Sequence, residues 1–172
     1  NGAGKTTTLN GIIRVFESEG VSFALCAPTG RAAKRISELT GRDAKTLHRL
    51  LEYAPRNGDY VFNRNKDNQL QYDAVIADES SMIDLSLFSH LLEALPLKSK
   101  LILVGDAAQL PPVGAGNVFR DLLECGYLPT VRLDRIFRQA RRSLIVTNAH
   151  EILNVPMPVL NAKDRDFFFI ST

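Results

Sequence analysis

Short apolar runs alternate along the chain with stretches in which apolar residues recur every three or four positions. The short runs are typical of buried β-strands, and the periodic stretches are typical of amphipathic helices. Because few hairpin signals separate the runs, we expect parallel strands joined by helices. The predicted strands span residues 22–27, 73–77, 101–104, 130–133 and 167–170.

The helices predicted between these strands carry start and stop signals. Gly41 and Gly126 stand where periodic stretches end, and Asp84 stands where one begins. Residues 54–72 are polar and are expected to form a long surface loop. The sequence thus predicts an α/β domain, a mostly parallel sheet with helices on both faces. The expected helices cover residues 31–39 and 46–53, a stretch after Asp84 with Leu85, Phe88, Leu91, Leu92 and Leu95 on its apolar face, a stretch around Phe119, Leu122 and Leu123, and residues 144–153.

Composition narrows the class without indicating a function. Of the 172 residues, 45% are hydrophobic and 23% are charged, which is typical of a globular domain rather than a disordered chain. No apolar run approaches the roughly 18 residues of a membrane span. The formal net charge is only +2, so global charge does not indicate a nucleic-acid partner. Two cysteines, Cys26 and Cys125, are too few for a disulfide framework and favour a reducing cytoplasm.

The chain opens on Gly2-Ala3-Gly4-Lys5-Thr6-Thr7, which matches the second half of a phosphate-binding loop, G-x-x-x-x-G-K-[ST]. Glycines let backbone N–H groups gather around a phosphate, and a helix that begins at Lys5 adds the positive end of its dipole. We expect Lys5 to reach the outer phosphates of ATP or GTP and the Thr6 hydroxyl to ligate Mg²⁺. The alternative is a glycine-rich turn before an amphipathic helix.

Two adjacent carboxylates, Asp78 and Glu79, follow the predicted strand over residues 73–77. A nucleotide hydrolase needs such a pair, because one acid holds Mg²⁺ through water and the other polarises the attacking water. We assign the first role to Asp78 and the second to Glu79. A solvated acidic turn is the simpler interpretation, but it does not explain the pairing with the Gly-Lys-Thr motif 73 residues earlier.

A third strand, over residues 101–104, is followed by a polar turn that contains Gln109. A glutamine side chain both donates and accepts hydrogen bonds, which suits a group that senses a γ-phosphate. Pro111, Pro112 and Gly114 then stiffen and turn the backbone without long side chains, as the close approach of a ligand would require. A structural proline-rich turn is the alternative.

Two helix starts offer groups that could bind a backbone phosphate. Residues 28–33 follow a strand and open a helix, so the N–H groups of Gly30 and Arg31 can bind a phosphate. A second polar cluster follows Lys45, and its His48 has no Cys or His at metal-ligand spacing. Each of these side chains could instead belong to a solvated helix face. The family resemblance described below implies that the contacted phosphates belong to DNA, with contacts expected from Pro28, Thr29, Gly30, Arg31, Thr46, His48, Arg49, Pro112, Val113 and Gly114.

Arginines crowd the segment between positions 132 and 142. Most of them are expected to be solvated charges. One guanidinium aimed at a γ-phosphate would stabilise charge that develops during transfer, an effect of about 10³–10⁵ in rate. Phe137 offers an apolar anchor for its neighbour Arg138.

These motifs together resemble one family. The set is similar to the first RecA-like motor domain of superfamily 1 helicases, and most closely to the RecD-like branch (exodeoxyribonuclease V alpha subunit), over nearly the whole chain. The motifs that carry the resemblance are Gly-Lys-Thr, Ala27-Pro28-Thr29-Gly30-Arg31-Ala32-Ala33, Thr46-Leu47-His48-Arg49-Leu50-Leu51, Asp78-Glu79-Ser80-Ser81-Met82, the stretch from Gly105-Asp106 to Pro112-Val113-Gly114, and Phe137-Arg138-Gln139.

The resemblance implies a RecA-like P-loop NTPase of the bacterial cytoplasm. Such an enzyme uses ATP and Mg²⁺ to move 5′→3′ along single-stranded DNA and to unwind duplex junctions in repair and recombination. The resemblance also implies that Lys5, Thr6, Asp78, Glu79 and Gln109 have the roles argued above, and that Arg138 contacts the γ-phosphate. A nuclease-containing recombination complex is a further partner that the family suggests.

The sequence departs from a complete motor of this family. Such motors close two RecA-like domains on ATP, and the motifs of the second domain are absent here. The first glycine of the phosphate loop would fall two residues before Asn1, so we expect the strand leading into the loop to be missing. Residues 1–140 are therefore expected to form a truncated first motor domain, with residues 141–172 leading toward the second. The isolated chain is predicted to be inactive, and residues 167–170 or a neighbouring chain are expected to fill the vacant strand position.

Two other functions fit part of the pattern. A conjugative relaxase-type helicase shares most of the motifs but would need an upstream nuclease domain with a histidine cluster. A non-catalytic clamp subunit that binds ATP and DNA would have little need of Glu79, Gln109 and Arg138 together. These three residues therefore favour an ATP hydrolase.

Overall fold

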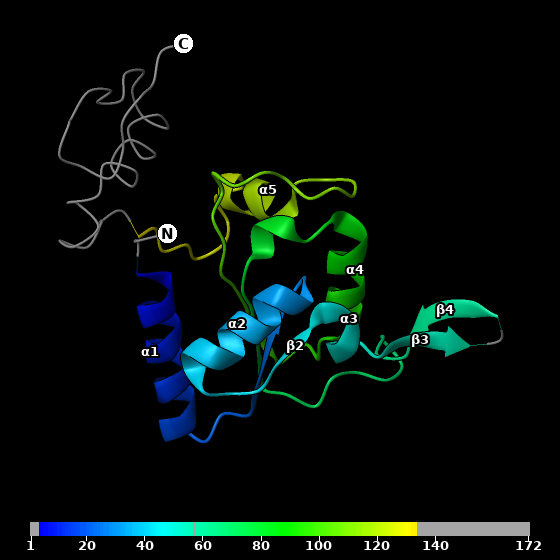
Figure 1. Cartoon of the computed structure of the whole chain (residues 1–172), viewed down its shortest axis with the longest axis horizontal. Helices are drawn as coiled ribbons and strands as arrows, with labels where there is room; N and C mark the ends of the chain where they lie inside the picture. The colour runs from blue at the N-terminus through cyan, green and yellow to red at the C-terminus, as the bar shows by residue number, and fades with distance from the viewer. Residues whose placement is uncertain (1–3, 57, 134–172) are drawn as a thin grey trace, which may run out of the picture. The chain divides into compact units, whose positions relative to one another are not determined.

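The computed structural model describes residues 4–56 and 58–133 (Figure 1). The chain divides into two compact units, and each is described by itself. One unit contains Asn1–Leu9 with Val131–Thr172, and the other contains Asn10–Thr130. The second unit holds the sheet and most of the candidate site residues.

Four parallel strands form the main sheet: β1 (Phe23–Ala27), β2 (Ala44–Thr46), β5 (Ala74–Ala77) and β6 (Lys100–Leu103), in the order β2-β1-β5-β6. Leu25 of β1 lies opposite Ile76 of β5, and Ile76 lies opposite Ile102 of β6. Every residue of β5 is buried. A central parallel strand is covered on both faces, which explains the uninterrupted apolar sequence of β5. The predicted α/β class with a mostly parallel sheet is confirmed.

The helices begin and end at the signals that the sequence carries. They are α1 (Lys5–Ser18), α2 (Gly30–Thr40), α3 (Leu47–Leu50), the 3₁₀ turn η1 (Ser80–Met82), α4 (Leu85–Ala94) and α5 (Val118–Glu124). Asp84 caps α4, because its Oδ1 accepts the backbone N–H of Leu87 at 2.8 Å. Gly41 ends α2 in the left-handed region, with φ of 67°, and its N–H donates to the carbonyl of Ser37. None of the described helices is long and apolar enough to cross a membrane.

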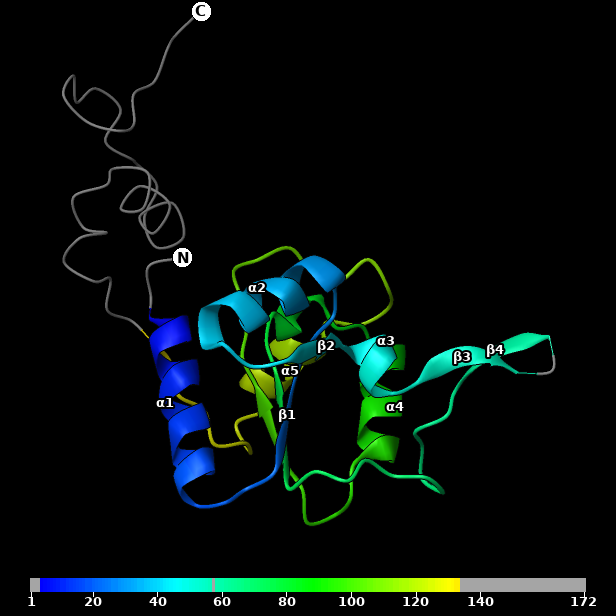
Figure 2. The ribbon, with the colours of Figure 1, turned by 60° about the horizontal axis from the view of Figure 1, so that its bottom comes forward.

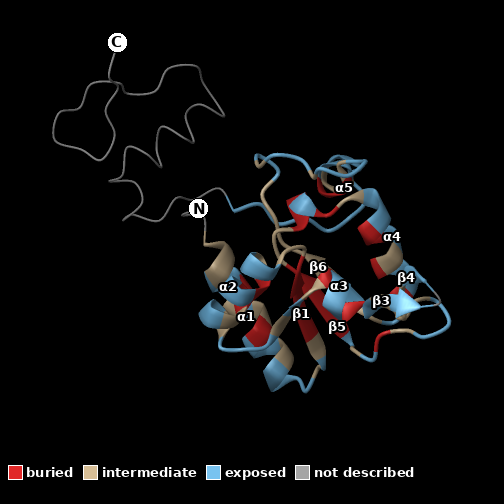
Figure 3. Cartoon of the chain, turned by 45° about the vertical axis from the view of Figure 1, so that its right-hand side comes forward, coloured by how far each residue is buried: buried red, intermediate tan, exposed pale blue. Residues whose placement is uncertain are grey.

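Alternate residues of the strands face opposite layers of helices. Ala24, Cys26, Val75 and Ala77 belong to one buried cluster together with residues of α3, α4 and α5. Figure 3 shows α2 and α4 on opposite sides of β1 and β5, with the buried positions between them. Burial raises the pKa of the Cys26 thiol to about 12, so this cysteine is a packing residue rather than a nucleophile.

A two-stranded hairpin extends from the α3 end of this unit (Figure 2). Strand β3 (Tyr53–Arg56) pairs antiparallel with β4 (Asp59–Phe62), and Tyr53 lies opposite Phe62. Their rings lie 4.6 Å apart between centroids, a cross-strand aromatic pair of the kind that stabilises hairpins. The expected loop over residues 54–72 is therefore wrong in its first part, because Pro55 and the turn residues conceal the strand pattern.

Three other expectations need correction. The helix predicted over residues 46–53 stops at Leu50, because the chain enters β3 at Tyr53. Residues 130–133 do not form a strand. On α4, Leu85 and Leu92 are 55% and 48% exposed, and the buried residues are Leu87, Phe88, Leu91 and Ala94. The helix and strand predicted over residues 144–153 and 167–170 lie outside the described residues.

Candidate functional site

The carboxyl ends of the four parallel strands lie at one edge of the sheet, and the candidate residues follow them there. Strand β1 leads into Pro28 and Thr29, and β2 leads into α3 with His48 and Arg49. Strand β5 leads into the acidic pair, and β6 leads into the turn that carries Gln109. Ligands of open parallel sheets bind at this edge. Within residues 10–130, the segments that carry these candidate residues therefore all begin at the same edge of the sheet.

The acidic pair continues the hydrogen-bonding ladder of the sheet. The N–H of Asp78 donates to the carbonyl of Cys26 on β1 at 2.9 Å, and Asp78 Oδ1 accepts the N–H of Glu79 at 2.8 Å. Glu79 has φ of 52° and ψ of 38°, a left-handed conformation that is rare for a residue other than glycine. The chain therefore turns sharply at Glu79, with both acids half-buried at the edge of the sheet.

Gln109 is held by the turn that follows the acids. Its side-chain Oε1 accepts the hydroxyl of Ser81 at 3.3 Å, which joins the loop after β6 to η1. Asp106 shapes the turn before Gln109, because its Oδ1 accepts the N–H of Ala108 and its carbonyl accepts the N–H of Gln109. The end of β5 and the loop after β6 therefore form one connected structure.

The loop continues along η1 and the start of α4, and a groove lies beside it. A Cβ on Gly114 would lie 2.7 Å from both Cβ and Cγ of Asp84, so only glycine fits this approach. One residue further on, the carbonyl of Ala115 accepts the N–H of Leu85 at 3.0 Å. The groove has a volume of about 630 Å³ and is lined by Met82, Asp84, Gln109 and residues 110–114. The predicted contact residues Pro112, Val113 and Gly114 all lie on its wall.

Two threonines cap the helices that begin at this edge. Thr29 Oγ1 accepts the N–H of Ala32 on α2, and Thr46 Oγ1 accepts the N–H of Arg49 on α3, each at 3.2 Å. A threonine hydroxyl that accepts a hydrogen bond can still donate one, so capping does not prevent contact with a phosphate. Gly30 and Arg31 are exposed in the first turn of α2, where backbone N–H groups have no partner within the helix.

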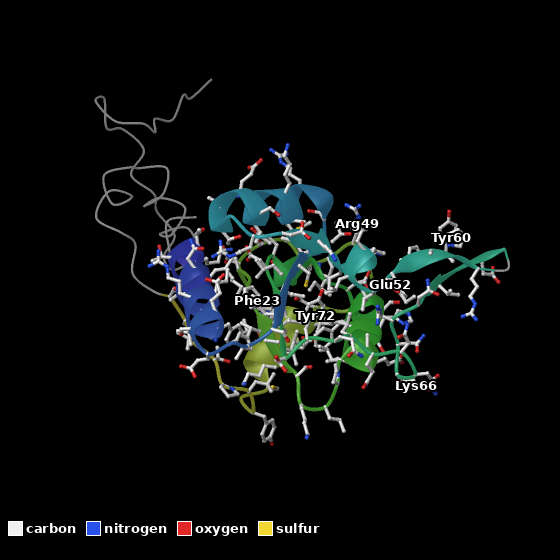
Figure 4. All side chains as sticks on the ribbon, turned by 90° about the horizontal axis from the view of Figure 1, so that it is seen from below. Phe23, Arg49, Glu52, Tyr60, Lys66 and Tyr72 are labelled. Atoms are coloured by element: carbon white, nitrogen blue, oxygen red, sulfur yellow. The ribbon has the colours of Figure 1, made fainter. Side chains whose placement is uncertain are left out.

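His48 belongs to an aromatic cluster that the sequence did not reveal. Its ring lies 5.3 Å from that of Tyr53 and 5.8 Å from that of Phe62, and Phe62 lies 4.4 Å from His90 on α4. Tyr60 extends the cluster along β4 and is 64% exposed. In Figure 4, Arg49 and Tyr60 point to the side of this unit on which α2 lies. The pairing of β3 with β4 and the packing of the hairpin beside α4 bring most of these rings together, so spacing along the sequence gave no signal.

The phosphate-loop residues lie at the start of α1. Gly4 has φ of 80°, a conformation that favours glycine, and Lys5, Thr6 and Thr7 form the first turn of the helix. These residues belong to the unit of Asn1–Leu9 and Val131–Thr172. Their convergence with Asp78 and Glu79 therefore stays a prediction. Gly2, Ala3 and Arg138 lie outside the described residues.

The donor set at the edge fits a magnesium ion that is shared with a nucleotide. Within the described ranges, no three His, Cys, Asp or Glu side chains gather closely enough to form a metal cage. Mg²⁺ is usually bound by one or two protein oxygens together with waters and substrate phosphates. Asp78 at the end of β5 supplies a carboxylate of that kind.

The fold and the edge define the class. A parallel α/β sheet with an acidic pair and a glutamine turn at its carboxyl edge is a RecA-like P-loop NTPase domain. Solved structures of Pif1 share this fold. One, of Bacteroides Pif1 bound to single-stranded DNA, has a TM-score of 0.56 and 24% identity over 90% of this chain and 41% of that chain. Another, on unwinding at forked duplex DNA by Pif1 helicases, has a TM-score of 0.57 and 24% identity over 89% of this chain and 42% of that chain.

Residues 1–115 match the AAA domain family, and the chain belongs to it. Its curated relatives include a RecD2 helicase and RecD subunits of RecBCD enzymes, which confirms the resemblance to the RecD-like branch. The ATP-dependent RecD2 DNA helicase of Deinococcus radiodurans is 41% identical over 94% of this chain. The RecBCD enzyme subunit RecD of Mycobacterium tuberculosis is 36% identical over 83% of it. The chain spans 22% and 28% of the lengths of these two relatives.

Proposed function

We propose that this chain is the first motor domain of a longer ATP-dependent DNA helicase of the RecD type. In that protein it binds and hydrolyses Mg-ATP to move 5′→3′ along single-stranded DNA, and it unwinds duplex during repair and recombination. The observation that carries the proposal is the Asp78-Glu79 pair at the end of β5, joined through η1 to Gln109 at the end of β6. The names of the RecD2 and RecD relatives support the choice of reaction.

Each proposed site residue has a distinct task in the proposed reaction. Lys5, with the N–H groups from Gly2 to Thr7, holds the phosphates, and Thr6 and Asp78 hold the magnesium ion. When bound, magnesium neutralises charge on the phosphate oxygens. Glu79 accepts a proton from the attacking water, a contribution of about 10²–10⁴ in rate. Gln109 and Arg138 contact the γ-phosphate.

The DNA strand is proposed to cross the starts of α2 and α3. The N–H groups of Gly30 and Arg31, the hydroxyls of Thr29 and Thr46 and the exposed Arg49 supply donors for backbone phosphates. The groove beside residues 110–114 supplies further contact area, with mostly apolar walls. Binding through phosphates predicts an affinity that falls with salt. For each neutralised phosphate, log Kd should rise by roughly 0.7 per log unit of salt concentration.

The direct test is ATP turnover by the longer protein, measured with and without single-stranded DNA. Turnover should be stimulated by DNA. Lys5→Ala should lose nucleotide binding, whereas Glu79→Gln should keep binding and lose turnover. Binding of ATP and DNA without turnover in the unaltered protein would contradict the proposal and would indicate a clamp.

The isolated 172-residue chain gives a second test. A motor of this type needs a second domain to close on ATP, so the chain alone should show no DNA-stimulated turnover. Robust stimulated turnover by the 172-residue chain would show that the second domain is dispensable.

A further inference from the structure

Ser81 is a buried hydroxyl residue that the proposed reaction leaves without a role. It lies in η1, two residues after Glu79, and only 5% of it is exposed. Its hydroxyl donates to Oε1 of Gln109 at 3.3 Å, across 28 positions of sequence. The bond joins the segment that follows the acids to the residue proposed to sense the γ-phosphate.

The direction of this bond matters because the two ends of a glutamine side chain are chemically different. The carboxamide oxygen only accepts hydrogen bonds, and the nitrogen only donates them. Oxygens of a γ-phosphate are acceptors, so Gln109 must present its nitrogen to them. A donor that binds Oε1 fixes the amide plane in the required orientation.

We infer that Ser81 is a positioning residue, which holds the carboxamide of Gln109 with its N–H groups directed to the γ-phosphate of a bound nucleotide. This inference rests on the proposed function. It adds a residue that contacts no substrate and acts through Gln109.

Both partners of the bond are held on a rigid framework. The N–H of Ser80 donates to the carbonyl of Val104 at 2.9 Å, which fixes η1 to the end of β6. A Cβ on Gly105 would lie 3.1 Å from the backbone N of Ser81 and 2.9 Å from the ring of Phe119, so this junction is tightly packed. A hydroxyl on such a framework can hold a defined amide orientation.

Ser80 provides a matched control in the same turn. It is 1% exposed, and its hydroxyl donates to the backbone carbonyl of Ala77 at 2.7 Å. Replacing either serine with alanine removes one buried hydroxyl from η1. Only the change at Ser81 removes a partner of Gln109, so the pair separates positioning from general stability.

The experiment uses the longer protein and compares its affinities for ADP and for a non-hydrolysable ATP analogue, both with Mg²⁺. ATP turnover is measured in parallel. Ser81→Ala should reduce the preference for the analogue about tenfold, with the affinity for ADP unchanged, and should lower kcat by about 10- to 100-fold. Ser80→Ala should keep both the preference and kcat within about twofold. If Ser81→Ala lowers stability, a second pair of variants repeats the test. Ser81→Thr keeps the hydroxyl, and Ser81→Val has nearly the same shape without it, so only Ser81→Val should lose the preference for the analogue.

The outcomes separate this inference from the proposed role of Gln109. Equal weakening of ADP and the analogue in Ser81→Ala, or equal behaviour of Ser81→Thr and Ser81→Val, would overturn the inference. If Gln109→Glu still loses the preference in that case, the role of Gln109 stands without Ser81. If Gln109→Glu binds both nucleotides as the unaltered protein does, the role of Gln109 is wrong and the inference about Ser81 is overturned with it.

Discussion

Strand β5 has an aspartate at each end, and the two carboxylates have different surroundings. Asp73, before the strand, is exposed, and its Oδ2 accepts both the backbone N–H of Ser22 at 2.9 Å and the hydroxyl of Ser22 at 2.6 Å. Asp78, after the strand, is half-buried, and its Oδ1 accepts the N–H of Glu79. Asp73 joins the start of β5 to the residue before β1, whereas Asp78 lies where β5 leads into η1.

The difference reflects the two edges of a parallel sheet. At the carboxyl edge, β1, β2 and β5 lead within three residues into the starts of α2, α3 and η1. Helix starts expose N–H groups and carry the positive end of the dipole, so anionic ligands bind there. At the opposite edge, β1, β2 and β6 follow the ends of α1, α2 and α4, and β5 follows a loop. The same residue type therefore has structural contacts at one edge and, in the proposed function, holds the magnesium ion at the other.

A second pair shows that backbone conformation alone does not mark the site. Glu52 and Glu79 both lie in the left-handed region, with φ of 55° and 52°. At Glu52 the conformation has a local explanation, because its carbonyl accepts from Asn63 and its carboxylate pairs with Arg64 at 2.8 Å. Position at the carboxyl edge, rather than a strained φ, distinguishes Glu79.

The largest difference in ATP turnover is expected between variants in which one or the other aspartate flanking β5 is replaced by asparagine. Asp78→Asn should lower Mg²⁺-dependent ATP turnover of the longer protein by about 10- to 100-fold, because the carboxylate that holds the ion is lost. Asp73→Asn should leave turnover within about twofold, because its contacts are structural. Turnover is measured across a magnesium titration.

Excess magnesium should partly restore Asp78→Asn and have no effect on Asp73→Asn. Equal losses of turnover in the two variants would break the contrast between the edges. Such a result would mean that both aspartates act through stability alone.

The next effect tests how tightly the carboxyl edge is built. In Gly114→Ala the new Cβ overlaps Asp84, so the loop must move, at a cost of about 1–3 kcal/mol in the free energy of unfolding. Gly11→Ala is the matched control, because a Cβ at this position in α1 meets nothing within 4 Å. The control should gain about 0.5–1 kcal/mol from the helix preference of alanine. Urea unfolding of the 172-residue chain measures both, and an unchanged Gly114→Ala would show that the loop is loose.

The sequence was sufficient to predict the elements whose signals are local. Strand β5 is an uninterrupted apolar run, and Asp84 precedes a periodic stretch, so the strand and the cap were both predicted. Strand β2 was not predicted, because it has only three residues, none of them buried, at the edge of the sheet, which is too few to show a hydrophobic period. The bond between Ser81 and Gln109 escaped prediction because it depends on the packing of β5 beside β6.

A smaller effect is expected at the cap of α4, which forms one wall of the groove. Asp84→Ala should lower the free energy of unfolding by about 1 kcal/mol, because the N–H of Leu87 loses its acceptor. Asp84→Asn keeps an oxygen acceptor and should retain most of the stability. Thermal unfolding of the two variants measures the difference, and equal losses would indicate that the charge, not the cap, stabilises this helix.

The smallest effect is expected at the opposite edge and depends on pH. The hydroxyl of Ser22, followed by its backbone N–H, lowers the pKa of Asp73 below its ordinary value of 3.8, and the charge of Lys100 adds to this. The unfolded chain therefore binds a proton at Asp73 more readily than the folded chain does. The stability that the ionised Asp73 contributes is present above about pH 4 and is lost as the pH falls through the pKa of Asp73 in the folded state. Ser22→Ala removes the strongest of these interactions. The fall in Tm between about pH 5 and pH 3 should therefore be shallower in Ser22→Ala than in the unaltered chain, with Asp73→Asn as the reference that cannot titrate. An identical fall in Tm in Ser22→Ala and in the unaltered chain would show that the Ser22 hydroxyl does not stabilise the ionised carboxylate of Asp73.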